Sequence, residues 1–433
     1  MGQDAIQFVC QIADKLNASD SFPVIFPSSS PVFDQMQPQM SGNPRLVYAW
    51  LTMKREMGEL ELIERIRSEW GAAGRGAGGA AGCGSRSLAR NLVLGIGDDC
   101  AILRPPKGHE ILVTTDFTLE GRHFRRDLHP PESAGHRTLA RGLSDLAAMG
   151  ARPLAAFLSL ALPGDMLPTR AGRVWVERFF AGLRSLADRH AVPLAGGDTA
   201  ESPSDLVLAD IVLIGSAPAG RALRRSGARD GDALYVTGEL GGAAAELAAM
   251  DRRAATNPAH PYKDLGAPSM PRSLRNGWES TPNQLTAHPH MFPQPRLAVG
   301  LALLRRRLAT ACIDLSDGLS TDLAHLCRES GVGAEVSSAA LPIHPLALQA
   351  RTARARHASP DRALDLALHG GEDYELLFAA PPSVRLPRSL AGVRVTRIGS
   401  LVRGHSISLL GPTGRRTPLQ PGGWEHFTGK HED

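Results

Sequence analysis

The chain has 433 residues, of which 42% are hydrophobic and 21% are charged, and its formal net charge at pH 7 is +4. This length suffices for two domains that each bury a core, and the composition is that of a soluble globular protein. The small net charge and the lack of a dense basic stripe argue against a nucleic-acid partner, and no run of about 18 apolar residues indicates a membrane span.

The five cysteines are widely spaced and include no C-x-x-C pair. An odd and scattered set fits a reducing compartment better than a disulfide framework or a zinc site. The N-terminus lacks the basic and then apolar pattern of a secretion signal. We therefore expect the protein to be cytoplasmic.

Residues 1–56 differ in composition from the rest of the chain, with clusters of Pro, Ser, Gln and Met and little periodicity. They predict either a disordered extension or a start codon assigned too far upstream. A regular pattern begins at Met57 with a short amphipathic helix. The glycine- and alanine-rich residues 71–84 predict a flexible loop.

Strands and helices then alternate, which favours a mixed α/β (α+β) architecture in two halves. We predict an N-terminal domain over 57–219 and a C-terminal domain over 220–433, with an insertion at about 251–287 that is rich in Pro, Asn, His and Ser. The strands expected are 111–115, 154–162, 192–195, 206–214, 233–237, 311–315, 374–379, 393–398 and 406–410. The helices expected are 132–149, 169–190, 241–250, 295–307 and 319–330.

Six short segments place an acidic residue beside Gly, Ser or Thr, and we expect an apolar strand to end at the acid in five of them. They are GIGDD (95–99), VTTD (113–116), LSDL (143–146), AGGDT (195–199), IDLSDG (313–318) and, as the sixth, GGEDY (370–374). One such turn alone is more typical of an Asx turn or a helix N-cap. Six together favour a site for Mg²⁺, which prefers hard oxygen ligands and leaves places for substrate phosphates.

The phosphate-binding motifs of other kinases are not found. The sequence contains no G-x-x-x-x-G-K-[ST] loop and no protein-kinase signature, and it has only five lysines. If the protein handles ATP, metal ions and arginines must neutralise the phosphate charge.

Eight segments, in order, resemble the thiamine-monophosphate kinases, a family of the PurM-like ATP-binding superfamily. They are GIGDDCAIL (95–103), TTDFTLEGRHF (114–124), LSDLAAMGARP (143–153), GGDTA (196–200), GRALRRSGARDGD (220–232), HPHMFPQPRLAVG (288–300), IDLSDGLSTDL (313–323) and GGEDYELLF (370–378). The resemblance implies a two-domain PurM-like fold, with an N-terminal mixed sheet and helices that bind ATP and magnesium, and a C-terminal α/β domain. It also implies a homodimer.

The implied reaction transfers the γ-phosphoryl group of ATP directly, in line, to thiamine monophosphate, with several Mg²⁺ ions as cofactors and no residue acting as acid or base. The attacking phosphate oxygen is already ionised at pH 7, so the difficulty is to bring two polyanions together. The positions that match the family's metal motifs are Asp98, Asp99, Thr114, Thr115, Asp116, Asp145, Asp198, Asp314 and Asp317. Those that match its ATP contacts are Gly197, Arg225 and Ser316, and those that match its substrate contacts are His123, Glu372 and Trp424.

Two alternatives remain open. One is another PurM-like enzyme that uses ATP, although such relatives lack the combination of GGEDYEL with a terminal Trp. The other is a non-catalytic sensor of thiamine phosphates, which would be expected to have lost metal-binding carboxylates that this chain retains.

Overall fold

The computed structural model describes residues 58–71, 91–96, 98–256, 288–350 and 362–424. The extension predicted at 1–56 lies outside the described residues, as do 72–84 of the predicted loop and 257–287 of the predicted insertion. The described ends of these two segments are helical. Gly71 is the last residue of α4 (Glu59–Gly71), and α7 (Gly242–Thr256) runs past its predicted end at residue 250.

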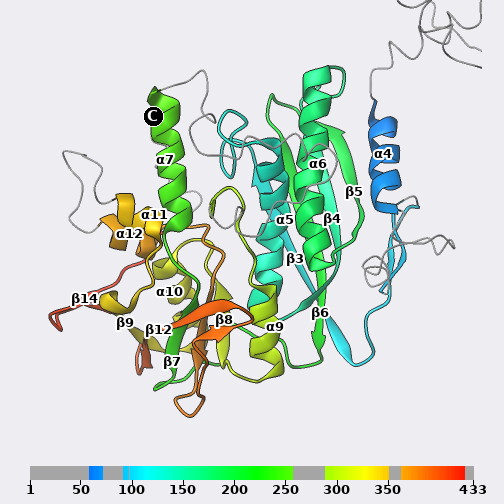
Figure 1. The fold of residues 1–433 in the computed structure, drawn as a ribbon. Coiled ribbons are helices and arrows are strands. Elements are labelled where there is room, and N and C mark those ends of the chain that lie inside the picture. The colour runs from blue at the N-terminus through cyan, green and yellow to red at the C-terminus, as the bar shows by residue number, and fades with distance from the viewer. Residues whose placement is uncertain (1–57, 72–90, 97, 257–287, 351–361, 425–433) are drawn as a thin grey trace, which may run out of the picture.

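The first part of the chain forms a four-stranded sheet in the order β3-β6-β4-β5, with two helices on one face (Figure 1). Its strands are β3 (His109–Leu119), β4 (Arg152–Leu162), β5 (Leu194–Glu201) and β6 (Leu208–Pro218), and its helices are α5 (Pro131–Ala148) and α6 (Arg170–His190). The β4–β5 pair is parallel, and the other pairs are antiparallel. The short strands β1 (Leu92–Leu94) and β2 (Ile102–Leu103) pair with each other, and α4 lies beside β5.

Helices α5 and α6 approach each other closely because each presents a glycine to the backbone of the other. A Cβ atom at Gly135 would lie 1.9 Å from the carbonyl oxygen of Phe179, and one at Gly182 would lie 2.0 Å from the carbonyl oxygen of Glu132. Any larger side chain at either position would push the helices apart. The contact therefore fixes α5 against α6.

The second part of the chain forms an eight-stranded sheet in the order β14-β13-β9-β12-β7-β10-β8, with β11 paired to β12. Its strands are β7 (Ala233–Thr237), β8 (Ala311–Asp314), β9 (Gly333–Ser337), β10 (Leu376–Ala380), β11 (Ser389–Leu390), β12 (Val393–Val402), β13 (Ile407–Leu410) and β14 (Arg416–Pro418). Its helices are α7, α9 (Leu297–Arg305), α10 (Leu319–Ser330), α11 (Pro345–Ala350) and α12 (Arg362–His369), with one 3₁₀ turn, η2 (Ser338–Ala340).

Helix α5 lies between the two sheets (Figure 1). It packs on β3 and β6 of the first sheet and on α9 and β8 of the second. Near the C-terminal end of α5, a Cβ atom at Gly300 of α9 would lie 1.9 Å from the carbonyl oxygen of Ala147. Helix α5 thus brings side chains of the first part next to side chains of the second part.

The alternation of helices and strands confirms the predicted α/β class. The predicted helix 319–330 and strand 233–237 have the observed bounds, whereas the strand predicted at 192–195 runs from Leu194 to Glu201. In the part of the chain that is described, no helix combines the length and apolar character that crossing a membrane requires. The domain boundary at residue 219 stays a prediction.

Candidate active site

A pocket of about 210 Å³ lies where α5 and β3 meet the segments that follow β8 and precede β10. Eight of the predicted site residues line it: Asp116, Asp145, Asp314, Ser316, Asp317, His123, Glu372 and Trp424. These residues are up to 308 positions apart in the chain, and they include all three predicted substrate contacts. We call this cavity the acidic pocket.

Three carboxylates from three elements form an acid cluster in the acidic pocket. Asp116 comes from the middle of β3, Asp145 from α5 and Asp314 from the end of β8. The Thr114 hydroxyl donates a hydrogen bond to Asp145, and the Ser144 hydroxyl donates one of 2.8 Å to Asp314. Asp145 and Asp314 are thereby each held in one orientation.

Burial acts on all three acids, and the charge of Asp145 acts on the other two. Burial, followed by the charge of Asp145, raises the pKa of Asp116 to about 6 even though Arg141 opposes the shift. Burial and Asp145 likewise raise the pKa of Asp314 to about 7, and burial raises the pKa of Asp145. A cation placed between these carboxylates would relieve the repulsion.

The donors fit magnesium, because they are carboxylate and hydroxyl oxygens. Among the described residues, however, no group of three or more His, Cys, Asp or Glu side chains could hold a metal ion. Magnesium usually takes only one or two carboxylates and fills its other positions with water and phosphate oxygens. The arrangement is therefore suited to a metal that arrives with a nucleotide or a phosphorylated substrate.

The loop after β8 is held by Asp322 of α10. The Asp322 carboxylate accepts hydrogen bonds of 3.1 Å from the backbone N–H groups of Ser316, Asp317 and Gly318. Burial, followed by the charges of Asp314 and Asp317, raises the pKa of Asp322 to about 8. This acid, which the sequence did not single out, shapes the loop that carries the predicted ATP and metal residues.

Glu372 and Tyr374 have left-handed backbones, with φ of 66° and 50°. Residues other than glycine seldom adopt this conformation, so the surroundings must enforce it. The backbone N–H of Glu372 donates to the carbonyl of Ser316, and that of Tyr374 to the carbonyl of Leu315, both at 2.8 Å. These bonds tie the GGEDY segment to the loop after β8 and direct Glu372 into the acidic pocket.

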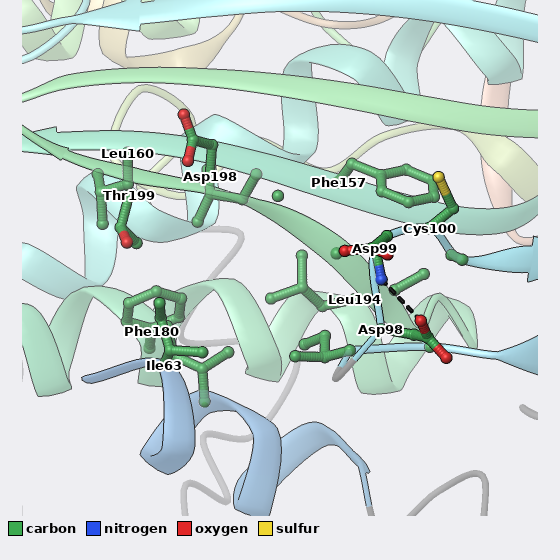
Figure 2. A pocket seen from close by; sticks show the side chains of 18 of the residues that line it. Ile63, Asp98, Asp99, Cys100, Phe157, Leu160, Phe180, Leu194, Asp198 and Thr199 are labelled. Atoms are coloured by element: carbon green, nitrogen blue, oxygen red, sulfur yellow. Dashed lines mark hydrogen bonds between the residues drawn. The ribbon is translucent and has the colours of Figure 1, made fainter. Parts of the chain in front are cut away.

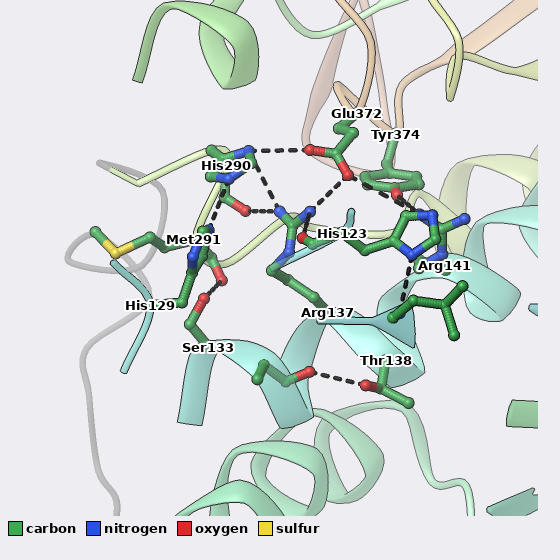
Figure 3. Close-up of polar contacts among 12 residues, drawn as sticks. His123, His129, Ser133, Arg137, Thr138, Arg141, His290, Met291, Glu372 and Tyr374 are labelled. Atoms are coloured by element: carbon green, nitrogen blue, oxygen red, sulfur yellow. Dashed lines mark hydrogen bonds and ion pairs between the residues drawn. The ribbon is translucent and has the colours of Figure 1, made fainter. Parts of the chain in front are cut away.

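The Glu372 carboxylate is held by cationic and imidazole groups (Figure 3). Arg137 Nη2 lies 2.5 Å from it and His290 Nδ1 lies 3.0 Å from it. Burial alone would raise the pKa of Glu372, but Arg137, His290 and Arg141 more than offset this effect and hold the pKa well below its ordinary value. Glu372 therefore presents a negative charge to any ligand.

Arg137 also reaches the segment that carries His123. Its guanidinium donates to the backbone carbonyl of His123 at 2.8 Å and to that of His290. The His123 Nδ1 accepts a hydrogen bond of 2.9 Å from the Leu119 N–H, so the neutral ring carries its proton on Nε2. One buried arginine thus fixes both Glu372 and the backbone of a second predicted substrate contact.

A second pocket, of about 870 Å³, lies between α4, the β1–β2 segment and strands β4 and β5 (Figure 2). Four predicted residues line it: Asp98, Asp99, Gly197 and Asp198. A Cβ atom at Gly197 would lie 1.8 Å from the carbonyl oxygen of Leu158, so glycine allows β5 to pair closely with β4. The predicted metal-binding aspartates are therefore divided between the two pockets, and Thr114 and Thr115 line neither of them.

Thr115 lies on the opposite face of β3 from its neighbours Thr114 and Asp116, as the pleat of a strand requires. Its hydroxyl donates a hydrogen bond of 2.7 Å to Asp210 of β6, a residue that the sequence reasoning missed. An acid within the otherwise apolar run 207–214 was the available signal. Arg225, a predicted ATP contact, is exposed, and its charge partly offsets the rise in the pKa values of Asp145 and Asp314.

The expectation that the acids end apolar strands was wrong for four of the five segments. In GIGDD the strand β1 ends at Leu94, before Asp98 and Asp99. Asp116 lies within β3 and Asp198 within β5, because the pairing with the neighbouring strand continues past each acid, to Leu119 in β3 and to Glu201 in β5. Asp145 lies inside α5, so the helical repeat and not the end of a strand sets the direction of its side chain. Asp314 does end β8, as expected.

Comparison with known proteins gives consistent results. The protein-family model described as AIR synthase related protein, N-terminal domain, matches residues 97–217. The thiamine-monophosphate kinase of Escherichia coli (strain K12) is 37% identical over 346 residues, which cover 79% of this chain and 94% of that protein.

Two solved structures extend the comparison to the fold. The thiamine-monophosphate kinase from Stenotrophomonas maltophilia K279a has a TM-score of 0.61 and 34% identity and covers 83% of this chain and 98% of that chain. The structure of AaThiL complexed with AMPPCP and TMP has a TM-score of 0.57 and 27% identity, and the match covers 86% of this chain and 98% of that chain. The predicted PurM-like fold and the predicted class of enzyme are confirmed, and the chain belongs to the thiamine-monophosphate kinase family.

Proposed function

We propose that this protein transfers the γ-phosphoryl group of ATP to thiamine monophosphate in a direct, in-line reaction assisted by several Mg²⁺ ions. The observation that carries the proposal is one pocket that combines the acid cluster with His123, Glu372 and Trp424. The AaThiL complex with AMPPCP and TMP supports ATP and thiamine monophosphate as the two substrates.

In this proposal two groups of residues in the acidic pocket have different tasks. Asp116, Asp145 and Asp314 would hold magnesium, which neutralises phosphate charge when bound. Trp424 is 50% exposed and offers a ring face to an aromatic or cationic ring of the substrate. Glu372, fixed in its ionised form, would orient that ring.

The remaining assignments are proposals as well. Ser316 lines the acidic pocket and Arg225 lies near the acid cluster, which supports ATP contacts by these two residues. Asp98, Asp99, Gly197 and Asp198 line the larger pocket, and Thr114 and Thr115 lie on the two faces of β3. We assign further metal and nucleotide contacts to these residues. A cytoplasmic location, inferred from the scattered cysteines, is likewise proposed.

We also propose a homodimer formed through the first sheet. The outer face of β3, an edge strand, exposes Ile111, Val113 and Phe117, and Phe117 is 61% exposed. Apolar side chains in a row on one face of a sheet are typical of an interface. We expect analytical ultracentrifugation to give a dimer for the wild type and a monomer for Val113→Glu/Phe117→Glu; a monomeric wild type would contradict the proposal.

The proposed reaction is tested by incubating the purified protein with ATP, MgCl₂ and thiamine monophosphate and separating the products by chromatography. We expect thiamine diphosphate and ADP to form in equal amounts, and no product when EDTA is added. A folded protein that forms neither product in excess magnesium would overturn the proposal. ADP without thiamine diphosphate would do the same, since it would indicate hydrolysis or another acceptor.

A further inference from the structure

Two arginines of α5 lie one helical turn apart and have different surroundings. Arg137 is 1% exposed, and its guanidinium is engaged by Glu372 and by two backbone carbonyls. Arg141 is 17% exposed and lines the acidic pocket. The Nε atoms of both are buried and have no hydrogen-bond partner among the described residues, but only Arg141 faces the space that a ligand would fill.

Arg141 lies at the boundary between the acid cluster and the predicted substrate contacts. Its Nη2 is 3.4 Å from Asp116 Oδ1, and its Nη1 is 3.9 Å from Glu372 Oε1. Nη1 also donates a hydrogen bond of 3.1 Å to the hydroxyl of Tyr374. Figure 3 shows Arg141 beside Tyr374, with Arg137 on the other side of Glu372.

Arg141 is cationic, because a guanidinium keeps its proton throughout the physiological pH range. Burial alone would lower its pKa, but the neighbouring acidic groups, among them the carboxylates of Asp116 and Glu372, outweigh that effect and raise it. The acceptor phosphate must lie between the residues that hold the ring and the acid cluster, since it joins the ring to the transferred phosphoryl group. At that boundary the carboxylates would repel a phosphate, whereas a guanidinium matches its geometry and charge.

We propose that Arg141 binds the phosphate group of the acceptor, so that it selects phosphorylated thiamine and orients the attacking oxygen. This inference rests on the proposed function. In the reaction that oxygen forms a bond to the γ-phosphorus of ATP, the bond from the γ-phosphorus to its bridging oxygen breaks, and the electron pair leaves with ADP. No proton has to move, so Arg141 acts by charge and position.

The test compares the binding of thiamine monophosphate with that of thiamine, which lacks the phosphate. Isothermal titration in MgCl₂, without ATP, is performed on the wild type, Arg141→Gln, Arg141→Lys and the control Arg416→Gln, whose side chain pairs with Glu335 outside both pockets. We expect Arg141→Gln to weaken thiamine monophosphate binding by about 10- to 100-fold, as for a lost charged hydrogen bond, and thiamine binding by less than about 2-fold. Arg141→Lys should recover part of the loss, and Arg416→Gln should match the wild type.

Several outcomes would overturn the proposal. They are an Arg141→Gln variant that binds thiamine monophosphate as the wild type does, equal losses for both ligands, or a wild type that does not prefer the phosphorylated ligand. The wild-type turnover assay distinguishes this failure from a failure of the proposed function. If the wild type makes thiamine diphosphate and Arg141→Gln keeps the preference, only the role of Arg141 is rejected.

Discussion

Asp145→Asn is expected to lower kcat for thiamine diphosphate formation by about 10³-fold while the protein still folds. Asparagine keeps the shape of the side chain and its hydrogen bond with Thr114 but removes the charge between Asp116 and Asp314. Because these carboxylates repel one another, losing one charge should leave the free energy of unfolding without Mg²⁺ equal or higher. The measurements are steady-state kinetics and thermal unfolding with and without MgCl₂.

The same experiment separates a metal role from a structural one. Magnesium together with an ATP analogue should raise the melting temperature of the wild type more than that of Asp145→Asn, because a ligand stabilises the state that binds it. The matched control is Asp188→Asn, which removes an exposed carboxylate from α6. Turnover near the wild-type value in Asp145→Asn, or an equal response of both proteins to magnesium, would contradict the proposed role.

Arg137→Met is expected to have the largest effect on stability. It removes a fully buried cation and one of the donors to Glu372, and it takes the guanidinium away from the carbonyl oxygens of His123 and His290. Breaking a buried ion pair costs about 3–5 kcal/mol of unfolding free energy, which denaturant titration would measure. The KM for thiamine monophosphate should rise as well, since Glu372 and the His123 segment lose their common contact.

A control is available in Arg65, which pairs with Glu177 on the surface, where the two side chains are 43% and 40% exposed. Arg65→Met should cost less than about 1 kcal/mol, as exposed ion pairs do. If Arg137→Met and Arg65→Met lose similar amounts, the buried network around Glu372 contributes nothing particular to the fold. A stable Arg137→Met variant with an unchanged KM would also show that Glu372 keeps its position without this arginine.

The alternation of elements was predictable because the hydrophobic periods of helices and strands are local properties of the sequence. The convergence of Asp116, Asp145 and Asp314 was not, because it depends on how α5 lies between two sheets. Two predictions for Asp145 were incompatible. The helix predicted at 132–149 contains Asp145, and the structure confirms that helix, so the interpretation of Asp145 as a turn residue was wrong.

The contacts that hold Glu372 were missed for a similar reason. Arg137 and Glu372 are 235 positions apart, and no local pattern reports such a pair. The spacing of Arg137, Arg141 and Asp145 at intervals of four was visible, however, and it places all three on one face of a helix. Asp210 could be identified only once its strand was paired with β3, which placed it beside Thr115.

The position of α5 between the sheets limits how the chain can change in length. Each residue of an α-helix turns the next by about 100°. An insertion or deletion between Arg137 and Asp145 would therefore rotate either Arg137 away from Glu372 or Asp145 out of the acidic pocket while the other stayed in place. The glycine contacts with α6 and α9 also fix the helix along its axis. The number of residues between Arg137 and Asp145 is therefore set by the contacts that these two side chains make.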